Sequence, residues 1–234
     1  MTKVTDKQIK IAPSILAGDF GRLAEEAKRL ENAGADSIHI DIMDGAFVPN
    51  LTFGPRAVEA INRSTDLYLD LHLMIYNPYD YIERFVAAGA DSITIHFEAT
   101  EEVEATLNYI RKCNIRAALA FNPKTSLSMI PKYLDKCDMI LLMTVQPGFG
   151  GQSLMPEVLE KVKFTRDLCN QLGIAEKGLS ANSSSLPFDI QVDGGINLNN
   201  VGQCIAAGAN VIVAGTSLFA ASDLSQAIKK MRNS

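Results

Sequence analysis

Two histidines and two aspartates stand near the ends of three apolar, strand-like runs of the sequence. They are His39 and Asp41 in SIHIDIM, His72 in LYLDLHLM and Asp193 in DIQVDGG. Side chains alternate between the two faces of a strand, so His39 and Asp41 share one face. Two buried aspartates without a cation would be costly, and no lysine or arginine lies on these faces. The four residues therefore predict one divalent metal ion, Zn²⁺ by preference, with Fe²⁺, Mn²⁺ or Co²⁺ also suited.

Other residues at these strand ends suggest supporting roles. Asp70 lies one step deeper on the face of His72, where it either orients that imidazole or serves as a structural hydrogen-bond acceptor. Met43, Met74 and Met143 share the inward parity, and we interpret them as an apolar cap that excludes water from a reactive intermediate. His96 ends a further strand, and we expect it at the rim of the pocket rather than on the metal.

Glycine-rich turns follow three consecutive strands in the second half of the chain. They are Gly148-Phe149-Gly150-Gly151, Gly194-Gly195 and Gly215-Thr216. Exposed backbone N–H groups in such turns can hold a phosphate without a cationic side chain. This suits a chain of net charge −5 that has no lysine or arginine at these positions. Glycine also serves ordinary tight turns, but three such turns on consecutive strand ends predict a phosphate site.

The combination of a metal ion, two carboxylates and a phosphate site, without a redox-cofactor motif, indicates proton transfer beside a carbonyl. Removing a hydrogen α to a ketone builds negative charge on the ketone oxygen, which a metal ion stabilises as an enediolate forms. One aspartate can take the proton from one face while a second returns a proton to the other face, which inverts the carbon. With Asp41 and Asp193 in these roles, the residues predict an epimerase or isomerase of a phosphorylated keto-sugar.

Eight short apolar runs alternate with helical patterns and would position these side chains. They begin near Ile9, Asp36, Leu67, Asp91, Ile115, Asp138, Phe188 and Asn210. AGAD at 33–36 and 88–91 and AGAN at 207–210 recur where a helix runs into a strand, at spacings that fit units of about 29 residues. We predict a single-domain α/β TIM (β/α)8 barrel over residues 1–234, with function at the C-terminal strand ends. A doubly wound sheet is the alternative, but APSILAGDFG lacks its GxGxxG motif.

Two helices carry signals at both ends. The first has Asp19 as N-cap and Gly34 just past its end, and another has Asn77 as N-cap, Pro78 at its first position and Gly89 as terminator. The connection from the sixth strand to the seventh is the longest, and it contains the polar stretch GLSANSSSLP at 178–187. This stretch predicts a solvent loop at the N-terminal face of the barrel, away from the chemistry.

Composition narrows the class of protein. The 234 residues are 47% hydrophobic and 21% charged, which is typical of a folded globular chain. No basic block indicates nucleic acid, no apolar run approaches the length of a membrane span, and the polar N-terminus lacks a signal core. Four scattered cysteines read as reduced thiols: Cys113, Cys137, Cys169 and Cys204. We expect a cytoplasmic protein that binds a small molecule, neither nucleic acid nor a membrane.

The sequence resembles the ribulose-phosphate 3-epimerase family through IAPSILAGDF, IHIDIMDGAFVPNLTFGP, LDLHLMI, FNPKT, LLMTVQPGFGGQ, VDGGI and VIVAGTS. The resemblance implies a ribulose-phosphate-binding barrel that interconverts D-ribulose 5-phosphate and D-xylulose 5-phosphate in the pentose phosphate pathway. It implies a metal held by His39, Asp41, His72 and Asp193, with Asp41 as proton acceptor and Asp193 as donor in one direction. Ser14 and His72 would contact the sugar, and the sugar and its phosphate would bind at Gly148, Phe149, Gly150, Gly151, Gly194, Gly195, Gly215 and Thr216.

The resemblance has departures, and alternatives stay open. Ala46, Gln146 and Thr216 differ from residues common in the family, but none is a proposed metal ligand. An epimerase for a six-carbon relative such as D-allulose 6-phosphate would use the same residues. A decarboxylase would carry a lysine among the aspartates of 41–44, where the chain reads DIMD. A non-catalytic sugar-phosphate sensor would not need a two-faced pair of acids. Assembly into a homo-oligomer is also implied.

Overall fold

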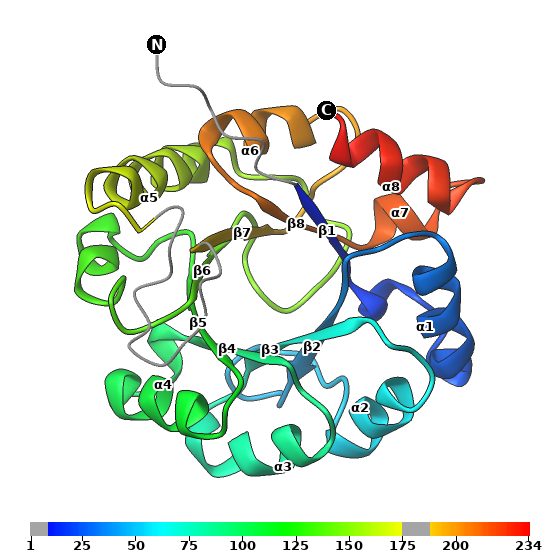
Figure 1. Ribbon diagram of the computed structural model, residues 1–234, viewed down its shortest axis with the longest axis horizontal. Helices are drawn as coiled ribbons and strands as arrows, with labels where there is room; N and C mark the ends of the chain where they lie inside the picture. The colour runs from blue at the N-terminus through cyan, green and yellow to red at the C-terminus, as the bar shows by residue number, and fades with distance from the viewer. Residues whose placement is uncertain (1–8, 175–187) are drawn as a thin grey trace.

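Eight apolar segments form eight parallel strands, each starting one residue after the start that the sequence predicts. The computed structural model describes residues 9–174 and 188–234. Its strands are β1 (Lys10–Pro13), β2 (Ser37–Met43), β3 (Tyr68–Met74), β4 (Ser92–His96), β5 (Arg116–Phe121), β6 (Met139–Met143), β7 (Asp189–Asp193) and β8 (Val211–Ala214). They pair in the order β1-β8-β7-β6-β5-β4-β3-β2, and a bridge between Ser14 and His39 joins β1 to β2. This nearly closed barrel confirms the predicted TIM fold and excludes the doubly wound sheet (Figure 1).

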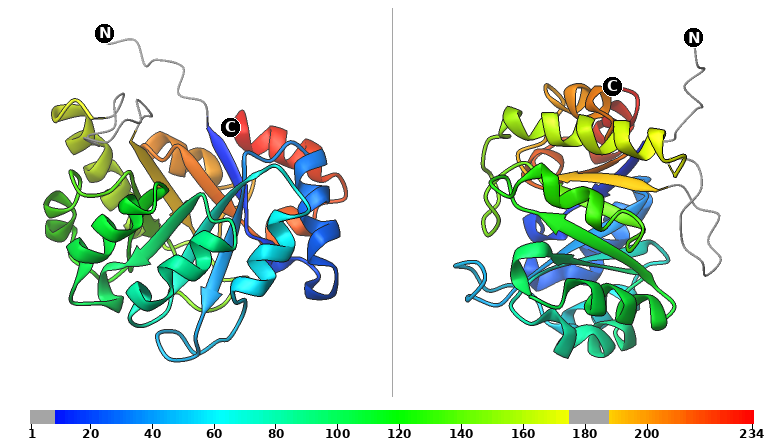
Figure 2. Two further views of the ribbon diagram at one scale, coloured as in Figure 1. Left: turned by 60° about the horizontal axis from the view of Figure 1, so that its bottom comes forward. Right: turned by 90° about the vertical axis from the view of Figure 1, so that its left-hand side faces the viewer.

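Helices surround the strands as an outer layer (Figure 2). They are α1 (Leu23–Asn32), α2 (Pro55–Asn62), α3 (Ile82–Ala87), α4 (Val103–Lys112), α5 (Leu159–Gln171), α6 (Val201–Ala207), α7 (Thr216–Phe219) and α8 (Leu224–Arg232). Between β5 and β6 the chain forms only the 3-10 segment η5 (Leu127–Lys132), because Pro131 inside it cannot donate a helical hydrogen bond. Within the described residues, no helix combines the length and apolarity needed to cross a membrane.

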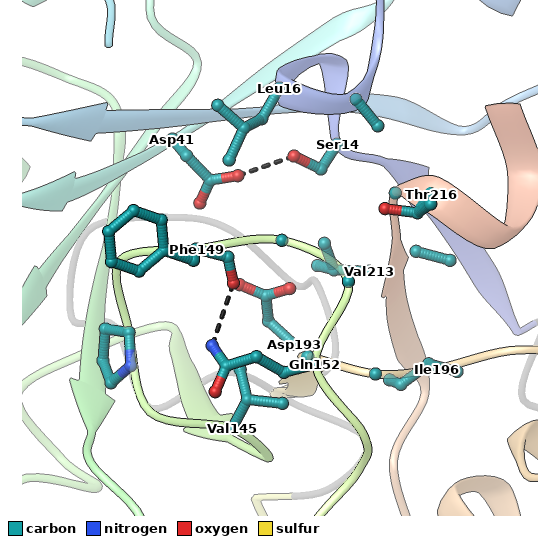
Figure 3. A pocket seen from close by; sticks show the side chains of 18 of the residues that line it. Ser14, Leu16, Asp41, Val145, Phe149, Gln152, Asp193, Ile196, Val213 and Thr216 are labelled. Carbon is teal, nitrogen blue, oxygen red and sulfur yellow. Dashed lines mark hydrogen bonds between the residues drawn. The ribbon is translucent and has the colours of Figure 1, made fainter. Parts of the chain in front are cut away.

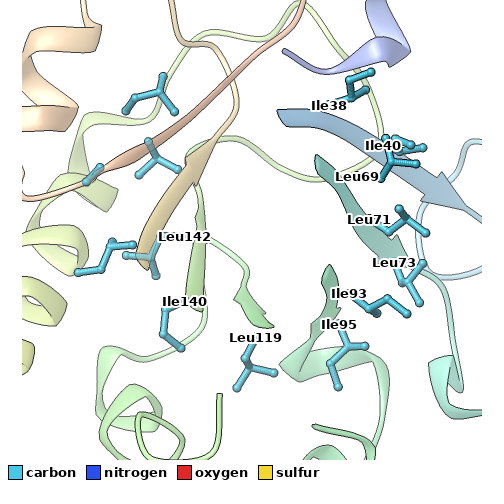
Figure 4. Packing of buried hydrophobic residues seen from close by; sticks show 14 of the residues in the cluster. Ile38, Ile40, Leu69, Leu71, Leu73, Ile93, Ile95, Leu119, Ile140 and Leu142 are labelled. Carbon is cyan, nitrogen blue, oxygen red and sulfur yellow. The ribbon is translucent and has the colours of Figure 1, made fainter. Parts of the chain in front are cut away.

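Alternation along the strands divides the core in two. On β2, the isoleucines at 38, 40 and 42 pack with the helices in the large hydrophobic cluster that Figure 4 shows in part. Smaller apolar clusters fill the interior of the barrel, one of which is Ala12, Ala118, Met139, Val211 and Val213. The intervening residues His39, Asp41 and Met43 therefore face inward, as the sequence pattern predicts.

The helix-end signals are confirmed in part. Asp19 accepts a hydrogen bond from the Gly21 N–H at 2.9 Å, but it caps the 3-10 segment η2 (Phe20–Arg22) that leads into α1 rather than α1 itself. Gly34 and Gly89 adopt left-handed φ values of 81° and 107°. The prediction that Asn77 caps a helix is wrong. Asn77 itself has a left-handed φ of 49° and makes no capping bond, since a cap needs extended backbone. The predicted loop at 178–187 lies outside the residues that the structure describes.

Charged side chains hold the N-terminal end of the barrel together. The buried carboxylate of Asp189 at the start of β7 accepts hydrogen bonds from Lys10 at 2.9 Å, Arg116 at 2.7 Å and the Asn210 amide at 2.7 Å. These partners come from β1, from β5 and from the residue before β8. Burial disfavours ionisation of Asp189, but Arg116 and Lys10 outweigh it and lower its pKa. The network thus ties four strands together at the end opposite the candidate site.

Candidate active site

A cavity of about 530 Å³ opens at the C-terminal ends of the strands. Most of the residues predicted for the site line it: Ser14, Asp41, Met43, Met74, Met143, Gly148, Phe149, Gly150, Gly151, Asp193, Gly194, Gly195, Gly215 and Thr216. Figure 3 shows the carboxyl groups of Asp41 and Asp193 pointing into this cavity. The two histidines, His39 and His72, are completely buried and do not line the cavity. No lysine or arginine is among the described residues that line it.

The four predicted metal ligands form one compact cluster at the floor of the cavity. One nitrogen or oxygen atom from each of them lies within 4.8 Å of the others. The closest approach is 3.1 Å, between His72 Nδ1 and Asp41 Oδ1, and His39 Nε2 lies 3.3 Å from each of these two atoms. Asp193 Oδ2 is 3.8 Å from both imidazole nitrogens. The acids reach this point from β2 and β7, which β1 and β8 separate around the barrel.

Asp70 supports the cluster from below, but at a different histidine from the one expected. Its carboxylate lies 2.9 Å from His39 Nδ1 and accepts hydrogen bonds from Ser92 Oγ at 2.7 Å and Gln191 Nε2 at 2.6 Å. The expectation that it orients His72 is therefore wrong. The strand register explains this, because Asp70 on β3 stands directly opposite His39 on β2.

His96 also departs from its expected place. It does not join the four-residue cluster, but neither does it lie at the rim, because it is fully buried and absent from the lining of the cavity. Its Nε2 lies 2.9 Å from Nε2 of His72, and the two rings stack with centroids 4.9 Å apart. Phe47 covers this ring with a centroid separation of 4.8 Å, which keeps water from it.

The surroundings of the two acids in the cluster shift their pKa values in opposite directions. Burial disfavours ionisation of Asp41, but the positive charge and the hydrogen bond of His39 hold its pKa below the usual range. Burial and the negative charge of Asp41 raise the pKa of Asp193 to about 7. Near neutral pH, one carboxyl is thus ionised while the other can carry a proton. Two carboxyls with divergent pKa values are typical of an acid and base pair.

The histidines respond to the same charges. Burial acts to lower the pKa of His39, but Asp41 and Asp70 outweigh it and raise that pKa well above its usual value. Burial lowers the pKa of His72 to about 4. A positive charge is therefore favoured between the two imidazoles and Asp41, and in the protein alone a proton on His39 supplies it.

The donor set and its spacing fit a divalent metal ion. Because the Nδ1–H group of His39 donates to Asp70, the Nε2 atom of a neutral His39 presents a lone pair to the other three ligands. Four ligands about 2.0–2.2 Å from a tetrahedral ion lie roughly 3.3–3.6 Å from one another. Five of the six separations between these nitrogen and oxygen atoms are 3.1–3.8 Å, close to that arrangement, and the sixth, between the two carboxylate oxygens, is at most 4.8 Å. The group can therefore hold a cation with little rearrangement.

Ser14 and the methionines complete the floor and walls. Ser14 Oγ donates to Asp41 Oδ2 at 2.6 Å, so it fixes the oxygen that does not face the histidines. Met43 and Met74 pack with Val48, whereas Met143 packs with Val145 and others in a separate buried cluster. All three methionines line the cavity. The wall next to the acids is thus apolar.

Glycine is required by the backbone in the turns around the cavity. Gly148, Gly151, Gly194 and Gly195 all have positive φ values, between 68° and 122°. A Cβ on Gly195 would lie 2.3 Å from the Leu154 nitrogen, so a side chain cannot be accommodated there. Phe149 is an exposed member of these turns, with 55% of its surface accessible.

Several residues of the site were not found by sequence reasoning. Asn50 and Gln152 line the cavity and hold the turn after β6. The Asn50 amide donates to the Gly148 carbonyl at 2.8 Å. The Gln152 amide donates to the Phe149 carbonyl at 2.9 Å (Figure 3). Gln191 faces Asp70 from the inward side of β7. Gln191 could have been found from the sequence, because it is a polar residue at an inward-facing position of an apolar strand. The positions of Asn50 and Gln152 in loops gave no comparable indication.

Comparison with known proteins gives a consistent assignment. Residues 10–219 match the pattern of a family described as the ribulose-phosphate 3 epimerase family. Proteins named ribulose-phosphate 3-epimerase from Chlamydia pneumoniae, Synechocystis and Escherichia coli are 49%, 48% and 43% identical to this chain. The alignments cover 93%, 97% and 97% of this chain, and 91%, 95% and 96% of those proteins.

Solved structures agree in fold. A 3-hexulose-6-phosphate synthase superposes with a TM-score of 0.63 at 15% identity, covering 97% of this chain and 98% of that one. KGPDC from Streptococcus mutans gives a TM-score of 0.69 at 15% identity, with 97% of both chains covered. At this identity the likeness extends to the barrel alone.

Proposed function

The chain belongs to the ribulose-phosphate 3-epimerase family, and from that premise we propose that it interconverts D-ribulose 5-phosphate and D-xylulose 5-phosphate. One observation carries the proposal. Asp41 and Asp193 bring two carboxyl groups from different sides of the barrel to one buried cluster at the floor of the cavity. Inversion at a carbon beside a ketone needs two such groups, because the proton leaves one face and another arrives at the opposite face.

In one direction, Asp41 accepts the proton from C3 and the electron pair of that C–H bond passes into an enediolate. Asp193 then donates its proton to the other face of C3, and the enediolate collapses to the ketone of the epimer. In the reverse direction the two acids exchange roles. Ser14 supports this assignment, since its hydrogen bond to Oδ2 holds the Asp41 carboxylate in one orientation.

We propose that His39, Asp41, His72 and Asp193 hold one divalent metal ion, with Zn²⁺ preferred for its tetrahedral coordination by nitrogen and oxygen. When bound, the ion supplies Lewis-acid stabilisation of the negative charge that develops on the ketone oxygen. The support is the buried cluster of two imidazoles and two carboxyls described above. The chain's own part is to hold these groups and to keep both acids within reach of C3.

The remaining lining residues provide binding and exclusion of water. We propose that the backbone of the turns at 148–151, 194–195 and 215–216 binds the sugar and its phosphate, with Ser14 near the sugar. Met43, Met74 and Met143 would cover the enediolate with apolar surface and so prevent its loss to water. The absence of lysine and arginine from the described lining favours recognition through backbone N–H groups.

The test is incubation with D-ribulose 5-phosphate in deuterated water, followed by NMR. The proposal predicts that xylulose 5-phosphate forms with deuterium at C3. A parallel reaction with D-allulose 6-phosphate distinguishes the six-carbon alternative. A marked preference for the hexulose phosphate would overturn the substrate assignment, and product without deuterium at C3 would overturn the proton-transfer mechanism.

A further inference from the structure

A chain of buried hydrogen bonds leads from His72 away from the cavity. His72 Nε2 lies 2.9 Å from His96 Nε2, and His96 Nδ1 lies 3.2 Å from Glu98 Oε2. Both histidines are completely buried, and the rings stack at an interplanar angle of 26°. The other oxygen of Glu98 accepts hydrogen bonds from the Asn122 N–H at 2.9 Å and from the Thr125 hydroxyl. Glu98 is therefore fixed at both of its oxygens.

Glu98 determines which ring nitrogen of His96, and then of His72, carries the proton. An ionised carboxylate only accepts hydrogen bonds, so a neutral His96 carries its proton on Nδ1 and presents a lone pair at Nε2. That lone pair can pair only with an N–H group, which places the proton of a neutral His72 on Nε2. Nδ1 of His72 is then bare, and it is this atom that lies 3.1 Å from Asp41 Oδ1 and 3.3 Å from His39 Nε2.

We propose that His96 and Glu98 are positioning residues that fix the tautomer and ring plane of His72, so that its Nδ1 lone pair is presented to the metal. The inference rests on the metal site proposed above. Each imidazole of the cluster is then oriented by a carboxylate. Asp70 orients His39 directly, and Glu98 orients His72 through His96. Neither His96 nor Glu98 lines the cavity, so both act through His72 rather than on the sugar.

This role also accounts for the segment FNPKT at 121–125, which the catalytic assignment leaves unused. The segment follows β5 and does not line the cavity, but its Asn122 and Thr125 hold Glu98. Its backbone is held in turn, since the Lys161 amine on α5 donates to the carbonyls of Asn122, Pro123 and Thr125. The support for His72 thus extends from the cluster to an outer helix.

Glu98→Gln gives the sharpest test, because it keeps the size of the side chain. The new amide can donate to His96 Nδ1, which reverses both histidines and moves the proton of His72 to Nδ1. We expect ¹⁵N NMR of the metal-free protein to show His72 protonated at Nε2 in the wild type and at Nδ1 in the variant. A wild-type His72 protonated at Nδ1, or an unchanged tautomer in Glu98→Gln, would overturn the proposal.

Affinity for Co²⁺, measured by competition titration, provides a second measure. His96→Phe keeps the stacking but removes the acceptor, and both it and Glu98→Gln should weaken Co²⁺ binding by about 10- to 100-fold. His96→Gln restores an acceptor oxygen and should stay within roughly threefold of the wild type. Thr94→Val is the matched control, because Thr94 pairs with His72 in register and its buried hydroxyl has no hydrogen-bond partner among the described residues.

The outcomes separate this proposal from the proposed function. A wild type that binds no Co²⁺ would refute the metal site itself. Wild-type binding together with equal affinity in His96→Phe and Glu98→Gln would refute only the positioning role. Equal weakening in Thr94→Val and His96→Phe would show a general effect of packing and would also contradict it.

Discussion

Each imidazole of the cluster is oriented from behind by a carboxylate, and this decides which ring nitrogen faces the other ligands. For His39 the contact is direct, since Asp70 lies 2.9 Å from Nδ1 and is itself held by Ser92 and Gln191. A carboxylate accepts a hydrogen bond but cannot donate one, so the Nε2 atom of a neutral His39 keeps its lone pair for the cluster. Groups that never touch the substrate thus determine the donor set.

Asp70→Asn tests this contact. The amide can donate to Nδ1 of His39 and so drive its proton to Nε2, toward the other ligands. We expect affinity for Co²⁺ to fall by about 10- to 100-fold, as measured by titration. Ser92→Ala is the control, because it removes one hydrogen bond to Asp70 but leaves the contact with His39. An Asp70→Asn protein that binds Co²⁺ like the wild type would show that Asp70 is only a structural acceptor.

At this scale, the sequence allowed the four cluster residues and the methionines to be placed correctly, because strand parity decides which side chains face inward. It did not allow Asp70 to be assigned to its partner. That contact depends on the register between β2 and β3, which no single strand encodes. His96 was misplaced for a related reason: the ring of Phe47 covers it, and this contact arises from a loop after a different strand.

Among the elements, the turns after the strands show how closely backbone geometry and the site are linked. Gly195 lies two residues after the acid Asp193 at the end of β7 and has a φ of 68°. The backbone of 152–154 packs against it, so that a Cβ at this position would overlap the Leu154 nitrogen and the Gln152 oxygen. The chain before α5 and the end of β7 therefore meet at a point where only glycine fits.

Gly195→Ala should accordingly destabilise the protein by about 1–3 kcal/mol, through the left-handed backbone and the overlap together. Urea unfolding measures this loss. Gly202→Ala is the matched control, because this α6 position has open space around a Cβ and lacks a positive φ. The control should gain about 0.4–1 kcal/mol. Equal stability of the two variants would contradict the packing described for Gly195.

The elements themselves were predictable in number and type, since each strand is an apolar run with a nearby helix end. The exceptions to this regular pattern were not predicted from the sequence. The fifth helix of a regular barrel is replaced by the 3-10 segment with Pro131, and Asn77 adopts a left-handed conformation instead of capping. The first has a local cause, because Pro131 cannot donate a helical hydrogen bond, whereas the backbone of Asn77 is held by a tertiary contact, since its N–H donates to the Ala99 carbonyl at 3.3 Å.

For the whole molecule, the two ends of the barrel are stabilised by different chemistry. The C-terminal end holds the cluster of histidines and acids, whereas the N-terminal end is closed around Asp189 by Lys10, Arg116 and Asn210. Homo-oligomeric assembly and a cytoplasmic location stay predictions at this scale.

The lowered pKa of Asp189 makes stability depend on pH. Because the folded protein favours the ionised form, this contribution is fully present above the unfolded pKa of about 3.9 and is lost as pH falls toward the lower folded pKa. Asp189→Asn should therefore reduce the free energy of unfolding at pH 7 and flatten its fall below about pH 4. Urea unfolding at pH 7 and pH 3 checks this, and a variant with the slope of the wild type would contradict it.

The central claim is that two acids act on opposite faces of one carbon, and single-acid variants in deuterated water test it most directly. With Asp41→Asn or Asp193→Asn, we expect interconversion of the two pentulose phosphates to fall by at least about 10²-fold, because one proton carrier is lost. The acid that remains should still exchange the C3 hydrogen of one sugar, and the two variants should exchange opposite sugars. Near-normal interconversion in either variant, or exchange of both sugars by one variant, would contradict the account.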